Sequence, residues 1–89
     1  MPTLKPGVSY RLLRWLDPPG LLLHLHPDSE WLIRGFWAEV FDMVFRKGME
    51  IEAIYHANRG SIPVDLERFK ELFEGFMNDL AQLGVVEEV

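Results

Sequence analysis

The clearest hydrophobic pattern lies in the last third of the chain. Asp65 and Glu67 stand where a helix N-terminus favours negative charge, and Gly84 stands where a left-handed residue ends a helix. The pattern therefore predicts one long helix between Pro63 and Gly84 with a single apolar face. Apolar residues recur in it at the spacing of one helix face, namely Leu66, Phe69, Phe73, Phe76, Leu80 and Leu83. Of these, Phe76 and Leu80 are expected in the core.

The first third of the chain predicts three short strands. Residues 8–16 are rich in large apolar residues, and the Asp-Pro-Pro-Gly segment at 17–20 breaks the run with strong turn residues. A second strand is predicted over 21–26, and a third over 30–34. Two tight turns that join three short strands predict an antiparallel meander.

Two shorter helices are predicted between the strands and the long helix. Residues 36–47 have helical apolar spacing and are followed by Gly48, and residues 50–58 repeat that spacing before Arg59-Gly60. The predicted fold is α+β, with a three-stranded antiparallel sheet followed by three helices. Aromatic residues are assigned to the core by default, namely Phe36, Trp37, Phe41, Phe45, Phe69, Phe73 and Phe76.

Length and composition limit the classes of protein. A chain of 89 residues forms a single domain, residues 1–89, with a modest core and no deep cleft between lobes. The absence of cysteine excludes disulfides, thiolate nucleophiles and thiolate zinc sites. Because the opening residues lack a signal-peptide pattern and no run of 18 apolar residues occurs, we expect a cytoplasmic protein without a membrane partner.

The charge is unevenly distributed along the chain. Residues 1–48 carry six Lys or Arg and five Asp or Glu, whereas residues 49–89 carry three and nine. Proteins that bind nucleic acid use basic patches to neutralise phosphates. The acidic second half therefore predicts no nucleic-acid partner.

Candidate catalytic and metal-binding residues are few. His24 and His26 lie two residues apart on a predicted strand and share a face, but a metal site needs at least three protein ligands and no third is evident. No phosphate-binding loop, nucleophile elbow or paired-carboxylate motif is present. We therefore expect no catalytic residue, no metal and no cofactor, and the chain is predicted not to be an enzyme.

Three segments carry a resemblance to a known family. They are Leu32-Ile33 leading into a helix, residues 48–54 (Gly-Met-Glu-Ile-Glu-Ala-Ile) and residues 76–86 (Phe-Met-Asn-Asp-Leu-Ala-Gln-Leu-Gly-Val-Val). This succession resembles the PqqD-like proteins, stand-alone elements that recognise the leader of ribosomally synthesised and post-translationally modified peptides. The likeness covers roughly residues 8–86. The family often has a Leu-Asn-Pro-Thr-like turn after the third strand, where this chain has Arg-Gly-Phe-Trp at 34–37.

The resemblance implies a winged helix-turn-helix-like fold and a non-catalytic role. Such proteins bind the leader of a precursor peptide and present it, as a peptide chaperone, to a radical-SAM enzyme, a leader peptidase or a cyclase. The resemblance does not identify the product of the pathway, which in such pathways is for example pyrroloquinoline quinone or a lasso peptide. In the family the leader adds as a strand beside the third strand and rests on the last helix. The resemblance thus implies as peptide-binding residues Glu30, Trp31, Leu32, Ile33, Arg34, Phe69, Leu72, Phe73 and Met77.

The residues themselves support that binding mode. The stretch 30–34 is short, apolar and without Pro or Lys, so at a sheet edge it invites strand addition. On the last helix Leu72 and Met77 lie toward opposite edges of the apolar arc, and one of them could line a groove.

Two alternatives stay open at this level. A winged-helix DNA-binding regulator has the same order of elements, but the acidic second half opposes phosphate contact. A structural or dimerisation subunit would use the same sheet edge to pair identical chains as a homodimer. The sequence does not separate self-pairing from leader-pairing.

Overall fold

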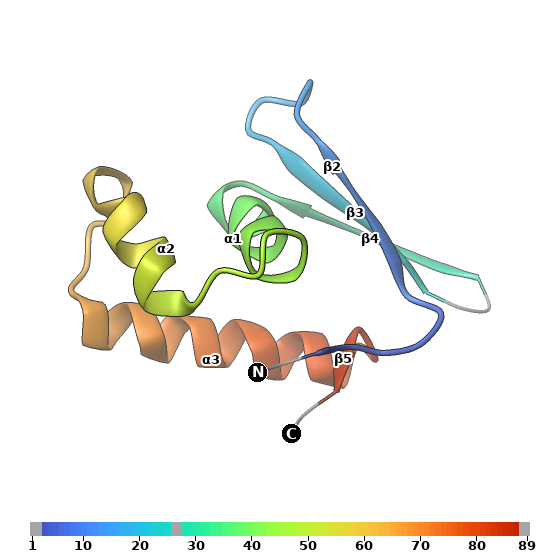
Figure 1. Cartoon of the computed structure of the whole chain (residues 1–89). Helices are drawn as coiled ribbons and strands as arrows, with labels where there is room; N and C mark the ends of the chain where they lie inside the picture. The colour runs from blue at the N-terminus through green and yellow to red at the C-terminus, as the bar shows by residue number, and fades with distance from the viewer. Residues whose placement is uncertain (1–2, 26–27, 88–89) are drawn as a thin grey trace.

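The computed structural model describes residues 3–25 and 28–87. The fold is α+β, with a three-stranded antiparallel sheet followed by three helices, as the sequence predicts. Helix α1 (Phe36–Phe45) lies between the sheet and helix α2 (Ile51–Ala57), and the long helix α3 (Leu66–Gln82) runs beneath them (Figure 1). Helix α1 therefore forms the middle of the molecule.

The sheet has the strand order β2 (Ser9–Leu13), β3 (Gly20–Leu25) and β4 (Ser29–Arg34). Side chains alternate between the two faces of a strand. Every second residue of the central strand is buried beneath the helices, namely Leu21, Leu23 and Leu25. The sheet is thus anchored through β3, and its inner face carries α1.

The strand ends differ slightly from the prediction. The first meander strand ends at Leu13 rather than Leu16, because the Leu16 N–H turns back to donate to the Leu13 carbonyl (3.4 Å) before the Pro-Pro segment. In the second strand the described residues end at Leu25, and the predicted final residue, His26, lies outside the described residues. The third strand begins at Ser29, one residue before the predicted start.

The helix ends follow local signals. Helix α3 begins after Asp65, whose carboxylate accepts a hydrogen bond from the Arg68 N–H (2.9 Å). Gly84 follows the helix with a φ of 82°, as predicted. Helix α1 is two residues shorter than predicted, because the Lys47 N–H reaches back to the Asp42 carbonyl (3.2 Å) and ends the regular helical bonding. Helix α2 also loses one residue at each predicted end and leads into a single 3₁₀ turn, η1 (Arg59–Ser61).

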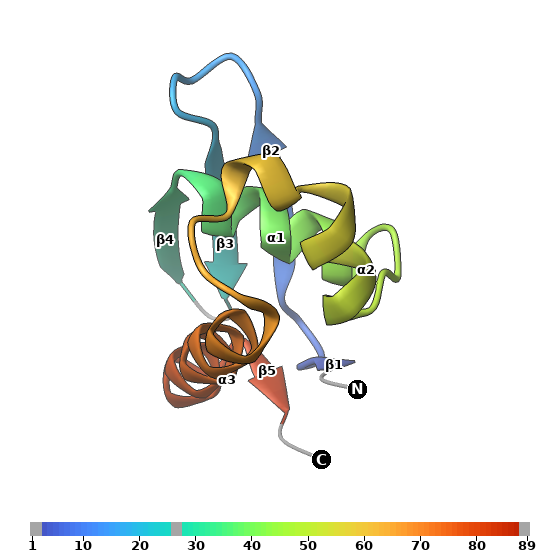
Figure 2. The same ribbon diagram turned by 90° about the vertical axis from the view of Figure 1, so that its left-hand side faces the viewer.

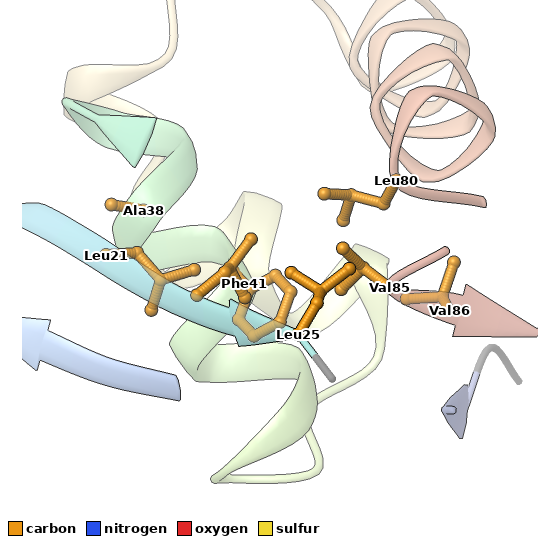
Figure 3. Packing of buried hydrophobic residues seen from close by; sticks show 8 residues of the cluster. Leu21, Leu25, Ala38, Phe41, Leu80, Val85 and Val86 are labelled. Atoms are coloured by element: carbon orange, nitrogen blue, oxygen red, sulfur yellow. The ribbon is translucent and has the colours of Figure 1, made fainter. Parts of the chain in front are cut away.

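The apolar side chains form two buried clusters. The first cluster joins the sheet, α1 and the C-terminal end of α3, and Figure 3 shows Leu80 pointing toward the region of Phe41, Leu25 and Val85. Its members are Leu21, Leu23, Leu25, Ala38, Phe41, Leu80, Val85 and Val86. The second cluster joins α1, α2 and the N-terminal half of α3 through Val40, Val44, Ile54, Tyr55, Ile62 and Phe69. Helix α1 contributes to both clusters and couples them.

The predicted core is confirmed in part. Leu80 is buried with 1% of its surface exposed, but Phe76 is only half-buried. Among the aromatic residues assigned to the core, Phe41 and Phe69 are buried, whereas Phe36, Trp37, Phe45, Phe73 and Phe76 keep partial exposure. A domain of this size has too little interior to enclose all of these rings.

The sequence did not predict a second, very short sheet. Strand β1 (Thr3–Leu4) pairs antiparallel with β5 (Val86–Glu87), and the Lys5 N–H donates to the Val85 carbonyl (3.0 Å). This pairing joins the two ends of the described chain beside the C-terminal end of α3 (Figure 1). The described chain therefore has one more strand at each end than the predicted element order βββααα.

Candidate functional site

Strand β4 is an outer strand of the meander. It pairs with β3 on one side, and within the described residues no strand pairs on its other side. Trp31 and Ile33 stand opposite the buried Leu23 and Leu21, which places them on the face toward the helices, whereas Leu32 lies on the outer face. Trp31 is 45% exposed and Leu32 is 50% exposed. The edge of β4 therefore presents apolar side chains on both faces.

A hydrogen bond just past β4 shows which backbone groups point outward. The Gly35 N–H donates to the Pro19 carbonyl (2.8 Å), and these two residues continue the β3–β4 register. Alternate pairs of an antiparallel ladder exchange hydrogen bonds, so the odd-numbered residues of β4 bond toward β3. The N–H and C=O groups of Glu30, Leu32 and Arg34 consequently point away from the sheet.

The side of α3 toward β4 is apolar and partly open. On the opposite side of α3, an ion pair between Lys70 and Glu52 (3.0 Å) faces α2. Leu72, Phe76 and Leu83 follow one another at helical spacing on the side away from α2, which is the side of β4 in Figure 2. Leu72 and Leu83 are each 38% exposed.

A cavity of about 200 Å³ lies where α1, α3 and the segment between η1 and α3 meet. The Trp37 ring stacks on Phe69 with centroids 5.8 Å apart, and the Tyr55 hydroxyl donates to the Val64 carbonyl (2.9 Å). These contacts hold the cavity walls in place. The lining residues are Phe36, Trp37, Ser61, Ile62, Pro63, Val64, Phe69 and Leu72.

The residues predicted to bind a peptide fall into two groups. Those from Glu30 to Arg34 lie together on the β4 edge, and Leu72 lies on the open side of α3. Phe69 is 2% exposed and lines the cavity. Phe73 and Met77 are half-buried against the core clusters. Between the two edges of the helix, Leu72 is therefore the residue on the side toward β4.

Sequence reasoning missed the cavity itself. Its walls come from three separate segments, and the residues Ser61–Val64 carry no periodic pattern. The sequence offered two local signals near the cavity. Trp37 places a large ring in the first turn of a helix, and Pro63 stiffens the connection before α3.

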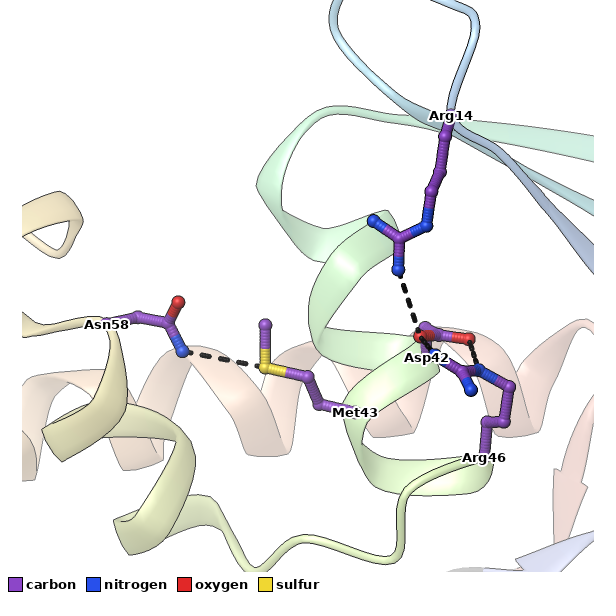
Figure 4. A network of polar contacts seen from close by, with 5 residues as sticks. All are labelled: Arg14, Asp42, Met43, Arg46 and Asn58. Atoms are coloured by element: carbon purple, nitrogen blue, oxygen red, sulfur yellow. Dashed lines mark hydrogen bonds and ion pairs between the residues drawn. The ribbon is translucent and has the colours of Figure 1, made fainter.

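A buried carboxylate ties α1 to the β2–β3 connection (Figure 4). Asp42 is 2% exposed and accepts two hydrogen bonds from Arg46 (2.7 and 2.9 Å), while an Arg14 nitrogen lies 3.8 Å away. The hydrogen bond to Asp42 raises the pKa of Arg46, and burial followed by the charge of Asp42 raises the pKa of Tyr10. Guanidinium groups thus occupy both oxygens of Asp42, which gives this carboxylate a structural role.

Only one member of the histidine pair considered from the sequence lies within the described residues. His24 lies on the outer face of β3 with its Nδ1 3.3 Å from Oε1 of Glu30, and His26 lies outside the described residues. Over residues 3–25 and 28–87, no three His, Cys, Asp or Glu side chains are close enough together to hold a metal ion.

A wider hollow of about 690 Å³ lies between the C-terminal half of α3 and the β1–β5 pair. It is open and is bordered by exposed polar side chains such as Asn78, Gln82 and Glu87. Ligand sites are usually concave and mainly apolar, so the smaller cavity beside Trp37 is the better candidate.

Comparison of the chain with models of known protein families, with curated proteins and with solved structures found no match. In the described part of the chain, none of the helices has both the length and the apolar character needed to cross a bilayer. The class of the molecule is therefore set by its own geometry, a small α+β domain with an open sheet edge beside an apolar helix side.

Proposed function

We propose that this chain binds an extended peptide that adds as a strand beside β4. The observation that carries the proposal is the outward direction of the backbone groups of Glu30, Leu32 and Arg34 on an outer strand. In strand addition, main-chain hydrogen bonds give affinity and side-chain contacts give specificity. The apolar side of α3 supplies the surface for those side-chain contacts.

The exposed apolar side chains gather at this edge. Trp31, Leu32, Leu72 and Leu83 lie on β4 or on the side of α3 toward it, and a further exposed ring, Trp15, lies in the turn after β2. Apolar residues scattered singly over a surface are ordinary, so the concentration of exposed apolar residues on β4 and on one side of α3 is the more informative feature.

The resemblance to the PqqD-like proteins supports a specific kind of peptide. On this proposal the peptide is the leader of a ribosomally made precursor, and the chain presents it to a radical-SAM enzyme, a leader peptidase or a cyclase. The chain itself performs no bond-making step. Incubation with the precursor peptide should therefore leave the mass of the peptide unchanged.

The exposed surface of α3 disfavours a nucleic-acid ligand. It carries Glu67, Glu71 and Glu74, and the guanidinium of Arg68 is 2.8 Å from the carboxylate of Glu71. A phosphate backbone requires uncompensated positive charge. Peptide binding is therefore preferred over the DNA-binding alternative.

Self-pairing is a second candidate, favoured by the charge order of β4. In an antiparallel pair of two β4 strands centred on Leu32, Glu30 of one copy stands opposite Arg34 of the other. Opposite charges in directly opposed positions stabilise strand pairs. A Glu30→Arg change would then dissociate the dimer, and adding Arg34→Glu would restore it, as measured by sedimentation velocity.

The test of peptide binding uses Leu32→Pro and Leu32→Ala. Both variants remove the exposed Leu32 side chain, but only proline removes the outward N–H and places its ring in the path of the added strand. The probe is a fluorescent peptide from a short reading frame encoded beside the gene for this chain. We expect Leu32→Pro to weaken binding at least about tenfold, roughly 1.4 kcal/mol, and Leu32→Ala, which keeps the outward N–H, to weaken binding clearly less.

Circular dichroism provides the folding control for both variants. Because the Leu32 N–H points away from β3, its loss leaves the β3–β4 hydrogen bonds in place. Equal binding by the folded proline variant and the parent would contradict strand addition at β4. A folded parent that forms dimers and binds no peptide would favour self-pairing instead.

A further inference from the structure

The cavity beside Trp37 has the size of one side chain. Its volume is about 200 Å³. Pockets for drug-sized ligands begin at roughly 300 Å³, whereas an apolar cavity of about 150 Å³ is large enough to bind benzene. The cavity is therefore too small for a typical small-molecule ligand and large enough for a Leu, Met or Phe side chain.

The lining of the cavity selects an apolar group. Most of its walls are aromatic or aliphatic, with the Ser61 residue and the backbone of the 61–64 segment as the polar exceptions. Ile62 is buried with 8% of its surface exposed, and the Val64 carbonyl is satisfied by the Tyr55 hydroxyl (2.9 Å). A charged side chain entering the cavity would lose hydration without meeting an oppositely charged group among the lining residues.

The cavity walls are set before a ligand arrives. The Phe69 ring contacts three other rings, with centroids 5.8 Å from Trp37, 6.4 Å from Phe36 and 5.6 Å from Tyr55. Rings fixed in this way cost little entropy on binding, and a preorganised site gains affinity for that reason.

The position of the cavity connects it to β4. Strand β4 ends at Arg34, and after Gly35 the next two residues, Phe36 and Trp37, are cavity walls. A strand laid beside β4 and continued past Arg34 reaches this region, and its alternate side chains point to the same face as Trp31 and Ile33. That face is the one toward the helices.

The charges near the cavity also constrain the ligand. Asp65, Glu67 and Glu71 lie at the start of α3, and the two positive groups there are already paired, Arg68 with Glu71 (2.8 Å) and Lys70 with Glu52 (3.0 Å). Acidic residues next to the inserted side chain would be repelled, and basic residues would be favoured.

We propose that the cavity beside Trp37 is the anchor pocket for one Leu-, Met- or Phe-sized side chain of the peptide that adds beside β4, flanked in that peptide by basic rather than acidic residues. This inference rests on the strand addition proposed above. It names Leu72, at the cavity mouth, as a specificity-determining residue.

A random dodecapeptide display library, selected against the parent and against Leu72→Trp, tests the pocket. The tryptophan fills the mouth of the cavity. Gln82→Trp is the matched control, because it adds the same ring at an exposed residue of α3 that lies at the far end of the helix and does not line the cavity. We expect parent-selected peptides to share one large apolar position and to bind Leu72→Trp at least about tenfold more weakly, while binding to Gln82→Trp stays within about twofold of the parent.

A double-mutant cycle with one selected peptide completes the test. Replacing the shared apolar residue by Ala should weaken binding to the parent at least about tenfold but cause little further loss with Leu72→Trp, since both changes remove one contact. Equal losses with both proteins would overturn the pocket assignment while leaving strand addition intact. Selected peptides that bind Leu32→Pro as tightly as the parent, or the absence of any enriched peptide, would overturn the strand addition itself.

Discussion

Replacing Leu80 by Ala tests how α3 is seated against the rest of the domain. Leu80 is 1% exposed and belongs to the cluster that also contains Leu25 of β3, Phe41 of α1 and Val85 (Figure 3). The side chain therefore connects the last turns of α3 to the sheet and to α1. Its truncation leaves a cavity among residues from four segments, and rigid neighbours close such a cavity only in part.

The expected loss follows from two contributions. Removing a buried Leu side chain forfeits transfer free energy and adds the cost of the residual cavity, and buried Leu→Ala changes typically cost about 2.7–5 kcal/mol. A domain of 89 residues has a total stability of roughly 4–13 kcal/mol, at about 0.05–0.15 kcal/mol per residue. We expect a loss of about 3 kcal/mol, which lowers the melting temperature by roughly 12–24 °C in a domain of this size.

Urea unfolding followed by tryptophan fluorescence measures this loss. Trp37 reports on the interior, since its ring centroid lies 5.0 Å from that of Phe76 and 5.8 Å from that of Phe69. Leu83→Ala is the control, because it removes the same side chain three residues later at a site 38% exposed, and we expect it to cost less than about 1 kcal/mol. Equal losses for the two variants, at an unchanged slope against urea, would refute the packing of α3 described above.

Two further predictions concern α3 and its neighbours. Asp65→Ala removes the acceptor for the Arg68 N–H (2.9 Å) and should cost about 1 kcal/mol by thermal unfolding, whereas Asp65→Asn, which keeps an acceptor, should cost less. The hydrogen bond from Lys70 lowers the pKa of Glu52, so its stabilisation is present above the ordinary Glu pKa and is lost as the pH falls through the lowered value. The stability difference between the parent and Glu52→Gln should accordingly shrink in acid, and a difference that grows there would contradict this assignment.

The sequence predicted the elements whose patterns are local. The apolar periodicity from Leu66 onward, the acidic Asp65 at the start of the helix and the left-handed Gly84 after its end each depend on residues within a few positions, and the structure confirms the helix between them. The order of the meander also followed from local turn signals, because two tight turns leave the third strand at an edge. Strand and helix ends differ from the predicted ends by one to three residues. At two of these ends a turn-type backbone hydrogen bond, from Leu16 to Leu13 or from Lys47 to Asp42, ends the regular bonding earlier than predicted.

Features that depend on distant segments were not predictable in the same way. Strands β1 and β5 have two residues each, too few for any alternation, and their pairing depends on the chain ends meeting. The choice between Leu72 and Met77 depended on where β4 lies relative to α3, which no helical pattern encodes. The cavity likewise requires Trp37, the segment before α3 and Leu72 to come together in space.

The two outer strands of the sheet differ in a way that explains why β4 is the better site for a new strand. Strand β2 carries the exposed Arg11, and the adjoining Arg14 extends to the buried Asp42 at 3.8 Å, so charged groups border that edge. Charges on an edge discourage further pairing. Strand β4 places its charges at Glu30 and Arg34 and keeps the apolar Trp31, Leu32 and Ile33 between them. An incoming strand must therefore carry apolar residues opposite residues 31–33 and suitable charges opposite Glu30 and Arg34. This requirement favours one pairing register. It also disfavours unspecific aggregation through the β4 edge.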